Sequence, residues 1–148
     1  MKKLLLILLI FAALGAKGQT KIQNDTEYSS VKLKKDDPGF LALKDTAQKY
    51  MSRFITALNK NTPGYRFLVK SDFVENGTHE HMWSQVKVYN NGTFKGIFID
   101  SPFNLHNIKT GDKVSIRKSG IEDWAIFDRK GTHVDGDFSD KYLKMQKL

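Results

Sequence analysis

The chain of 148 residues contains no cysteine. A thiolate zinc site, a cysteine nucleophile and a disulfide framework are therefore excluded, as is a lipoprotein acylated on cysteine. The sequence also lacks a Gly-x-Ser-x-Gly nucleophile motif, a phosphate-cradling glycine loop and internal repeats. No apolar run reaches the roughly 20 residues that a bilayer-spanning helix needs. A domain without disulfides must be held together by its own apolar core.

The N-terminal segment has the three parts of a secretory signal peptide. Two lysines precede the apolar run Leu4–Ala13, and Ala16 and Gly18 place small residues at the −3 and −1 positions of a cleavage site. We expect residues 1–18 to be removed, so that the mature protein begins near Gln19 and is exported to the periplasm or secreted. An uncleaved membrane anchor is the alternative.

The rest of the chain suits one domain. Residues 19–35 are polar with little periodicity and read as a flexible lead-in, and residues 36–148 form a single predicted domain. The net charge of +8 falls to +5 if three lysines leave with the signal segment. Because no basic stripe with interleaved aromatic residues is present, we do not expect a nucleic-acid partner. A protein or small-molecule partner is expected, with membrane contact only through the signal segment during export.

One helix is predicted, from about Pro38 to Asn59. Asp37 can cap its free amides, Pro38 fits its first turn, and Asn61 to Gly64 supply strong breakers after it. Its apolar residues follow at spacings of three and four, which indicates a core-facing helix. They are Phe40, Leu43, Ala47, Tyr50, Met51, Phe54 and Leu58.

Beyond Gly64 the pattern is that of strands separated by turns. Asn91-Gly92 is a hairpin signal, and residues from Ser139 onward suit a short helix. The predicted fold is therefore α+β, with one N-terminal amphipathic helix packed on a twisted antiparallel sheet of about five strands and a short C-terminal helix. The expected strands are Tyr65–Lys70, His79–Tyr89, Thr93–Ile99, Lys113–Lys118 and Ile121–Phe127.

Two short motifs concentrate ionisable and aromatic groups. In His79-Glu80-His81-Met82-Trp83, strand alternation places both histidines and Trp83 on one face and Glu80 with Met82 on the other. The second motif is Glu122-Asp123-Trp124, and pairing of the two strands could bring carboxylates beside imidazoles. The candidate site residues are Glu80, His81, Trp83, Asp123 and Trp124.

This cluster supports two chemical interpretations. His79 and His81 with a carboxylate could hold a metal, but no third ligand is fixed by spacing, and we assign no metal or cofactor. His81 could instead act as a general base oriented by Asp123 or Glu80, as in a small hydrolase.

Two further interpretations involve neither catalysis nor a bound metal. A histidine held by a carboxylate and packed on tryptophan could simply fix the strand order. Alternatively, Trp83, Trp124 and their charged neighbours could contact a ligand or partner. We favour a binding or interaction domain, and we keep the hydrolase as the alternative.

The order of these motifs resembles the YegJ-like bacterial family, domain of unknown function 2314. The resemblance covers roughly Asp36 to Leu143 and implies a small α+β domain without a known activity, substrate or cofactor. The chain departs from the family pattern of two glycines before an aromatic residue, because Gly136 is followed by Asp137. The residues that carry the resemblance are Glu80-His81-Met82-Trp83, Gly96, Pro102, Gly111-Asp112, Ile121-x-Asp123-Trp124 and Gly136.

The mature N-terminus is expected at or near Gln19, because small residues flank the predicted cut and polarity rises directly after it. Intact-mass analysis of the exported protein checks this position. A mass that retains residues 1–18 would contradict it.

Overall fold

The computed structural model describes residues 37–140 and 142. The predicted signal peptide, the lead-in 19–35 and most of the predicted C-terminal helix lie outside these residues. No helix in the described part is long and apolar enough to cross a membrane. The elements, in order, are α1 (Pro38–Lys49), α2 (Met51–Lys60), β1 (Arg66–Glu75), β2 (Thr78–Asn90), β3 (Thr93–Phe98), β4 (Lys113–Arg117), the 3₁₀ turn η1 (Lys118–Gly120), β5 (Ile121–Phe127) and β6 (His133–Gly136).

The predicted helical region begins and ends where its capping residues indicate. A side-chain oxygen of Asp37 accepts a hydrogen bond of 2.9 Å from the backbone N–H of Phe40. At the other end Asn61 adopts a left-handed conformation with φ of 49° and closes the last turn.

The single predicted helix is divided at Tyr50, which is where the structure differs from the sequence pattern. Tyr50, with φ of −96° and ψ of 6°, ends α1 and precedes α2. Its ring stacks on Phe138 at 6.3 Å, and the guanidinium of Arg53 lies over it at 5.2 Å. The break therefore coincides with a tertiary contact that the helical spacing could not show.

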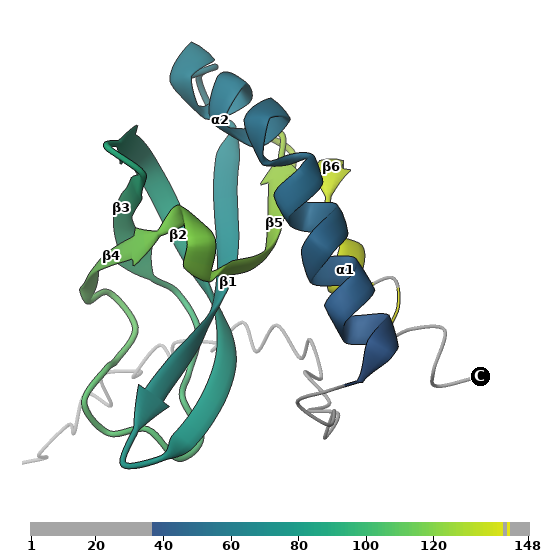
Figure 1. Cartoon of the computed structure of the whole chain (residues 1–148). Coiled ribbons are helices and arrows are strands. Elements are labelled where there is room, and N and C mark those ends of the chain that lie inside the picture. The colour runs from purple at the N-terminus through teal and green to yellow at the C-terminus, as the bar shows by residue number, and fades with distance from the viewer. Residues whose placement is uncertain (1–36, 141, 143–148) are drawn as a thin grey trace, which may run out of the picture. The chain divides into compact units, whose positions relative to one another are not determined.

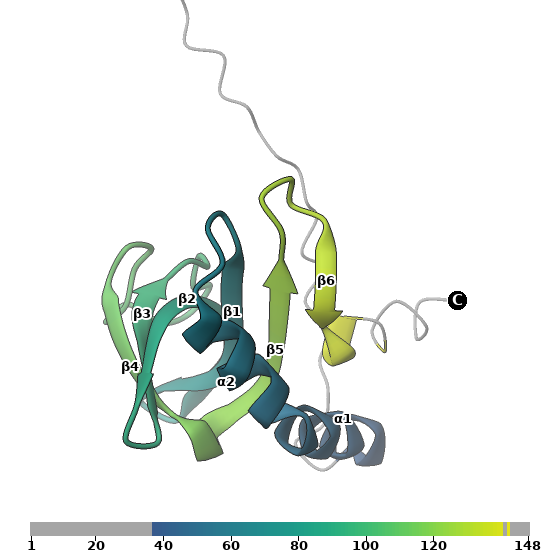
Figure 2. The same ribbon diagram turned by 90° about the horizontal axis from the view of Figure 1, so that it is seen from above.

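The six strands form one antiparallel sheet in the order β4-β3-β2-β1-β5-β6. Helix α1 packs against β5, and α2 packs against β2 and β5, so both helices serve the same apolar core (Figure 1, Figure 2). We call the side of the sheet turned away from this core the outer face. The buried core residues are Ala47, Met51, Phe54, Leu58, Phe67, Val69, Val86, Phe94, Ile116, Ile121, Trp124 and Ile126.

Both long hairpins turn on Asn-Gly pairs. Asn76 and Gly77 have φ of 50° and 80°, and Asn91 and Gly92 have φ of 47° and 74°. Two successive positive φ values define the tight turn whose twist matches that of paired strands. The hairpin predicted at Asn91-Gly92 is thereby confirmed.

The α+β prediction is confirmed, with one strand more than the five expected. The extra strand, β6, has only four residues and pairs with β5 at the sheet edge. Residues 138–140 and 142 are helical, in agreement with the predicted C-terminal helix. The hydroxyl of Tyr142 donates to Asp37 at 3.3 Å, which joins this segment to the start of α1.

Replacement of Phe54 by Ala is expected to reduce the free energy of unfolding by about 3–5 kcal/mol, because the side chain is fully buried. Its ring contacts three others, those of Phe67, Phe94 and Trp124. Denaturant melts measure the change. Leu41→Ala on the exposed side of α1 is the control and should cost less than about 0.5 kcal/mol. A loss below about 1 kcal/mol for Phe54→Ala would contradict the packing.

Candidate functional site

The centre of the candidate site is a pair formed by His81 on β2 and Glu122 on β5. Nδ1 of His81 lies 2.6 Å from Oε2 of Glu122. The carboxylate side chain is only 5 % exposed, whereas the imidazole is 43 % exposed. Since Glu122 accepts, Nδ1 carries the proton, and Nε2 is left without a hydrogen-bond partner among the described residues.

A β-bulge in β5 explains why Glu122 is the partner. Lys70 on β1 lies opposite Asp123, and the next residue, Ser71, lies opposite Ile121, so Glu122 is an extra residue in the ladder. A bulge re-aims a side chain, and here it turns Glu122 toward the face that carries His81. The sequence analysis named Asp123 or Glu80 as the orienting carboxylate, and the structure differs on this point.

The first turns of α1 lie beside this pair. The ring of Phe40 meets the His81 ring edge-on with centroids 5.6 Å apart, and Nζ of Lys44 lies 3.7 Å from Oε1 of Glu122. The hydrogen bond to Glu122 raises the pKa of His81 above its ordinary value of 6.5, against the opposing effect of partial burial. The charge of Asp72 also raises this pKa, and that of Lys70 lowers it.

A second histidine pair lies next to the first on the same face. Nδ1 of His79 is 2.7 Å from Oδ2 of Asp72 on the neighbouring strand β1. Asp72 is the register partner of His81, so the two pairs lie next to each other on the β1–β2 hairpin. Each imidazole thus has its own carboxylate, and the two do not converge on a common point.

Lys70 and Trp83 continue this face toward the middle of the sheet. They are register partners, and the lysine Nζ lies 5.5 Å from the centroid of the half-buried indole. The lysine is almost fully buried and its Nζ donates to Oγ of Ser139 at 3.4 Å. A cation held over an aromatic face stabilises the pair and presents the indole in a fixed orientation.

Asp123 and Trp124 are engaged inside the protein. The Asp123 carboxylate accepts from the N–H and Oγ–H of Ser139 at 2.7 and 2.6 Å and from the N–H of Phe138 at 3.2 Å. Trp124 is fully buried, and its indole N–H donates to the carbonyl of Ala47 at 2.9 Å. These two candidate residues hold the C-terminal segment and α1, respectively, against β5.

Glu80 points to the opposite face from His81, as alternation predicts. Its carboxylate accepts from the backbone N–H groups of Phe103 and Asn104, which fastens the loop after β3 to the edge of β2. Asp100 in the same loop accepts from the N–H of Trp83 at 2.7 Å. Burial raises the pKa of Asp100, and the charge of Lys70 partly offsets that effect.

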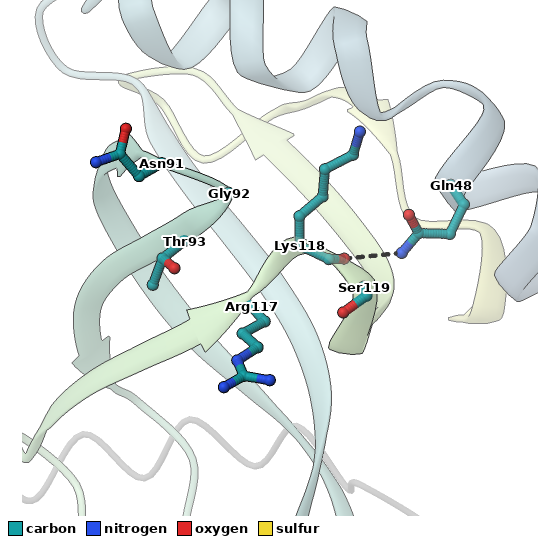
Figure 3. A pocket seen from close by; sticks show the side chains of 7 residues that line it. All are labelled: Gln48, Asn91, Gly92, Thr93, Arg117, Lys118 and Ser119. Carbon is teal, nitrogen blue, oxygen red and sulfur yellow. Dashed lines mark hydrogen bonds between the residues drawn. The ribbon is translucent and has the colours of Figure 1, made fainter.

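The described residues offer no metal site at His81, and one surface depression lies elsewhere on the molecule. Within residues 37–140 and 142, no three His, Asp or Glu side chains are placed to hold a metal ion. An open depression of about 460 Å³ lies instead between α1, the β2–β3 turn and η1. There Gln48 donates to the carbonyl of Lys118, and the side chains of Arg117 and Lys118 point in opposite directions (Figure 3).

Of the five candidate residues, only His81 and Trp83 lie together on the outer face, whereas Glu80, Asp123 and Trp124 have other contacts. The structure brings His81 and Trp83 together on the outer face and adds Glu122, Asp72 and Lys70. Lys70 could have been recognised from the sequence as a member of the site, because it lies within the apolar run that forms β1 and a buried lysine requires a specific partner. The sequence pattern did not indicate the role of Glu122, since the bulge depends on how β5 pairs with β1.

The fold and site define a small α+β domain whose long hairpin presents two carboxylate-held histidines beside a tryptophan. The chain belongs to a bacterial family, because residues 37–146 match the one described as "Uncharacterized protein conserved in bacteria (DUF2314)". The resemblance inferred from the motifs is thereby confirmed.

A curated relative agrees with this assignment. The chain is 33 % identical over 78 residues to "Uncharacterized protein YegJ" of Escherichia coli (strain K12), across 53 % of this chain. The matched part spans 50 % of that relative's length. No solved structure matches the chain.

Replacement of Glu122 by Gln is expected to lower the pKa of His81 toward 6.5, because the charged acceptor is lost. In the native protein this pair stabilises the fold fully below about pH 6.5, and its contribution disappears as the pH rises through the higher folded-state pKa. NMR titration of the imidazole measures the shift. Asp128→Asn, remote from His81, should leave it unchanged, and an equal shift in both variants would contradict the assignment.

Proposed function

We propose that the protein is an exported binding domain that recognises its ligand or partner through the His81 site. We define this site as His81, Trp83, Lys70 and the two carboxylates Glu122 and Asp72. One observation carries the proposal: a buried carboxylate holds an imidazole that is 43 % exposed and whose Nε2 has no partner in the described part of the chain.

The difference in burial between the two members supports binding over a purely structural role. A carboxylate is rarely buried unless its partners compensate for the lost hydration. Burying Glu122 fixes the ring of His81 and its tautomer, which is how supporting residues orient a recognition group. A structural pair would be expected to bury both partners, whereas this one leaves the imidazole accessible.

The neighbouring Trp83 adds the aromatic contact that recognition sites favour. Its indole is half-buried and lies under the ammonium of Lys70, so little side-chain freedom remains to be lost on binding. Tryptophan is among the residues that contribute most at interfaces. The ligand class that fits is one with a polar group for His81 and a flat or apolar part for Trp83.

The proposed place of action is the periplasm or the exterior of the cell. Support comes from the charged start, the short apolar run and the small residues before Gln19. The absence of cysteine is compatible with that location, because the apolar core around Phe54 and Trp124 replaces disulfide bonds as the source of stability.

The alternative is a small hydrolase in which His81 is the general base and Glu122 orients it. The fixed tautomer supports this alternative, because a neutral imidazole with the proton on Nδ1 keeps its lone pair on Nε2. No hydroxyl in the described part of the chain bonds to that nitrogen, so His81 would act on water. The rate of such an enzyme would fall as the pH drops through the pKa of His81.

Replacement of His81 by Gln tests binding against structure. The amide N–H of Gln can still donate to Glu122, so the free energy of unfolding should stay within about 1 kcal/mol of the wild type. Capture of the native partner or ligand from the exported fraction by the immobilised protein should fail. Thermal melting and mass spectrometry of the captured material provide the two measurements.

His133→Gln is the matched control, because His133 is an exposed histidine on the opposite edge strand β6. It should retain the captured material. A loss of 1–3 kcal/mol in His81→Gln with capture unchanged would favour the structural role and contradict the proposal.

A further inference from the structure

The outer face of β2, β3 and β4 carries a cluster of cations. On β3 the side chains alternate between buried Phe94 and Phe98 on the core side and exposed Lys95 and Ile97 on the outer side. On β4 the pattern continues, because Ile116 is buried while Lys113 and Arg117 on either side of it are exposed.

The register aligns these outward positions across the strands. Ile97 lies opposite Lys113, and Thr93 lies opposite Arg117. The β2 side has a bulge, in which Val86 pairs with Gly96 and Val88 pairs with Lys95. Lys87 is therefore the extra residue, and a bulge re-aims its side chain toward the exposed side. We call the set Lys87, Val88, Lys95, Ile97, Lys113 and Arg117 the outer basic face.

The charge of this face is not compensated. None of its four cations forms an ion pair with another described residue, in contrast to Lys44 and Arg53, which do. The sequence explains why, because residues 82–99 and 113–121 contain no aspartate or glutamate. All the charged side chains on these three strands from residue 82 onward are therefore positive.

Two aliphatic side chains lie among the cations. Val88 is 50 % exposed and Ile97 is 37 % exposed, and both belong to the same outward rows as Lys95 and Lys113. Cations that flank exposed aliphatic groups on one surface suit binding at a membrane interface.

We propose that the outer basic face docks on the surface of an anionic lipid bilayer. A protein partner is less well matched, because interface cores favour aromatic residues and disfavour lysine, and this face has three lysines and no aromatic residue. A single-stranded nucleic acid would need aromatic stacking platforms, which are likewise absent from the outer basic face. This inference goes beyond the proposed function, and it adds a membrane contact that the sequence did not predict.

A small soluble anion is also a poorer match. The depression of about 460 Å³ borders this face through Thr93 and Arg117, yet the second cation there, Lys118, points away from Arg117 (Figure 3). No two cations converge on one point in it, whereas the rows of the outer basic face spread their charge over three strands. A spread of charge suits a lattice of headgroups rather than one ligand.

The test is cosedimentation of the protein, purified from the exporting bacterium, with lipid vesicles. We expect binding to vesicles of 30 % phosphatidylglycerol in phosphatidylcholine, weak binding to phosphatidylcholine alone, and a decrease with added salt. Each basic residue near an anionic surface changes partition by about fivefold. The double variant Lys95→Glu/Lys113→Glu should therefore bind at least tenfold more weakly.

The matched control is Lys60→Glu/Lys130→Glu, which changes the net charge equally at exposed positions outside the face. It should bind as the wild type does. A second variant, Lys87→Gln/Arg117→Gln, repeats the test without reversing charge, and thermal melting establishes that each variant is folded.

Three results would overturn the proposal. The first is equal binding to neutral and anionic vesicles, which would point to the apolar N-terminal segment. The second is an equal loss in both Glu variants, which would show that only the net charge matters. The third is binding to an acidic polypeptide or to duplex DNA with no binding to anionic vesicles.

Discussion

The arrangement of the site depends on the one extra residue in β5. Glu122 is inserted between Ile121 and Asp123, so the side chains of two consecutive carboxylates lie on the side of the sheet away from the core. The residues that flank them, Ile121 and Trp124, lie in the core. Without the bulge, strict alternation would place one of the two carboxylates on the side of the core residues, where an unpaired carboxylate is costly. The bulge therefore permits a charged site and an apolar core within four residues of one strand.

The two carboxylates connect the site to distant parts of the chain. Glu122 links His81 on β2 with Lys44 on α1, and Asp123 holds the start of the C-terminal helix through Ser139. Trp124, next in sequence, anchors α1 from the opposite side through the carbonyl of Ala47. A movement of α1 or of the C-terminal segment would thus shift the carboxylates of β5 and, through Glu122, the position of the imidazole. The rigidity of the site therefore depends on the packing of these two segments.

The sequence predicted what depends on local chemistry. The Asp37 cap and the Asn-Gly turn form as expected, because each is determined by neighbouring residues. The helix stripe enters the core only from Ala47 onward, since Phe40 packs on His81 instead. The break at Tyr50 and the bulges at Lys87 and Glu122 were not predicted, since they arise from contacts between segments far apart in the chain. The motifs therefore pointed to His81 and Trp83, while the carboxylate that contacts His81 is Glu122 and was not predicted.

The positions of the His81 site and the outer basic face on the twisted sheet determine whether the two proposed surfaces can bind at the same time. The His81 site lies on β1, β2 and β5, and the outer basic face lies on β2, β3 and β4, so the two surfaces share β2. Neighbouring strands are rotated by about 20–25°, so the two steps from β4 to β2, the strand that carries His81 and Trp83, turn the outer face by about 40–50°. The twist of the β1–β2 hairpin along its length adds to this rotation (Figure 1). A bilayer that contacts the lysines of β3 and β4 would therefore leave the His81 end of the β1–β2 hairpin tilted away from the membrane surface and accessible to a ligand.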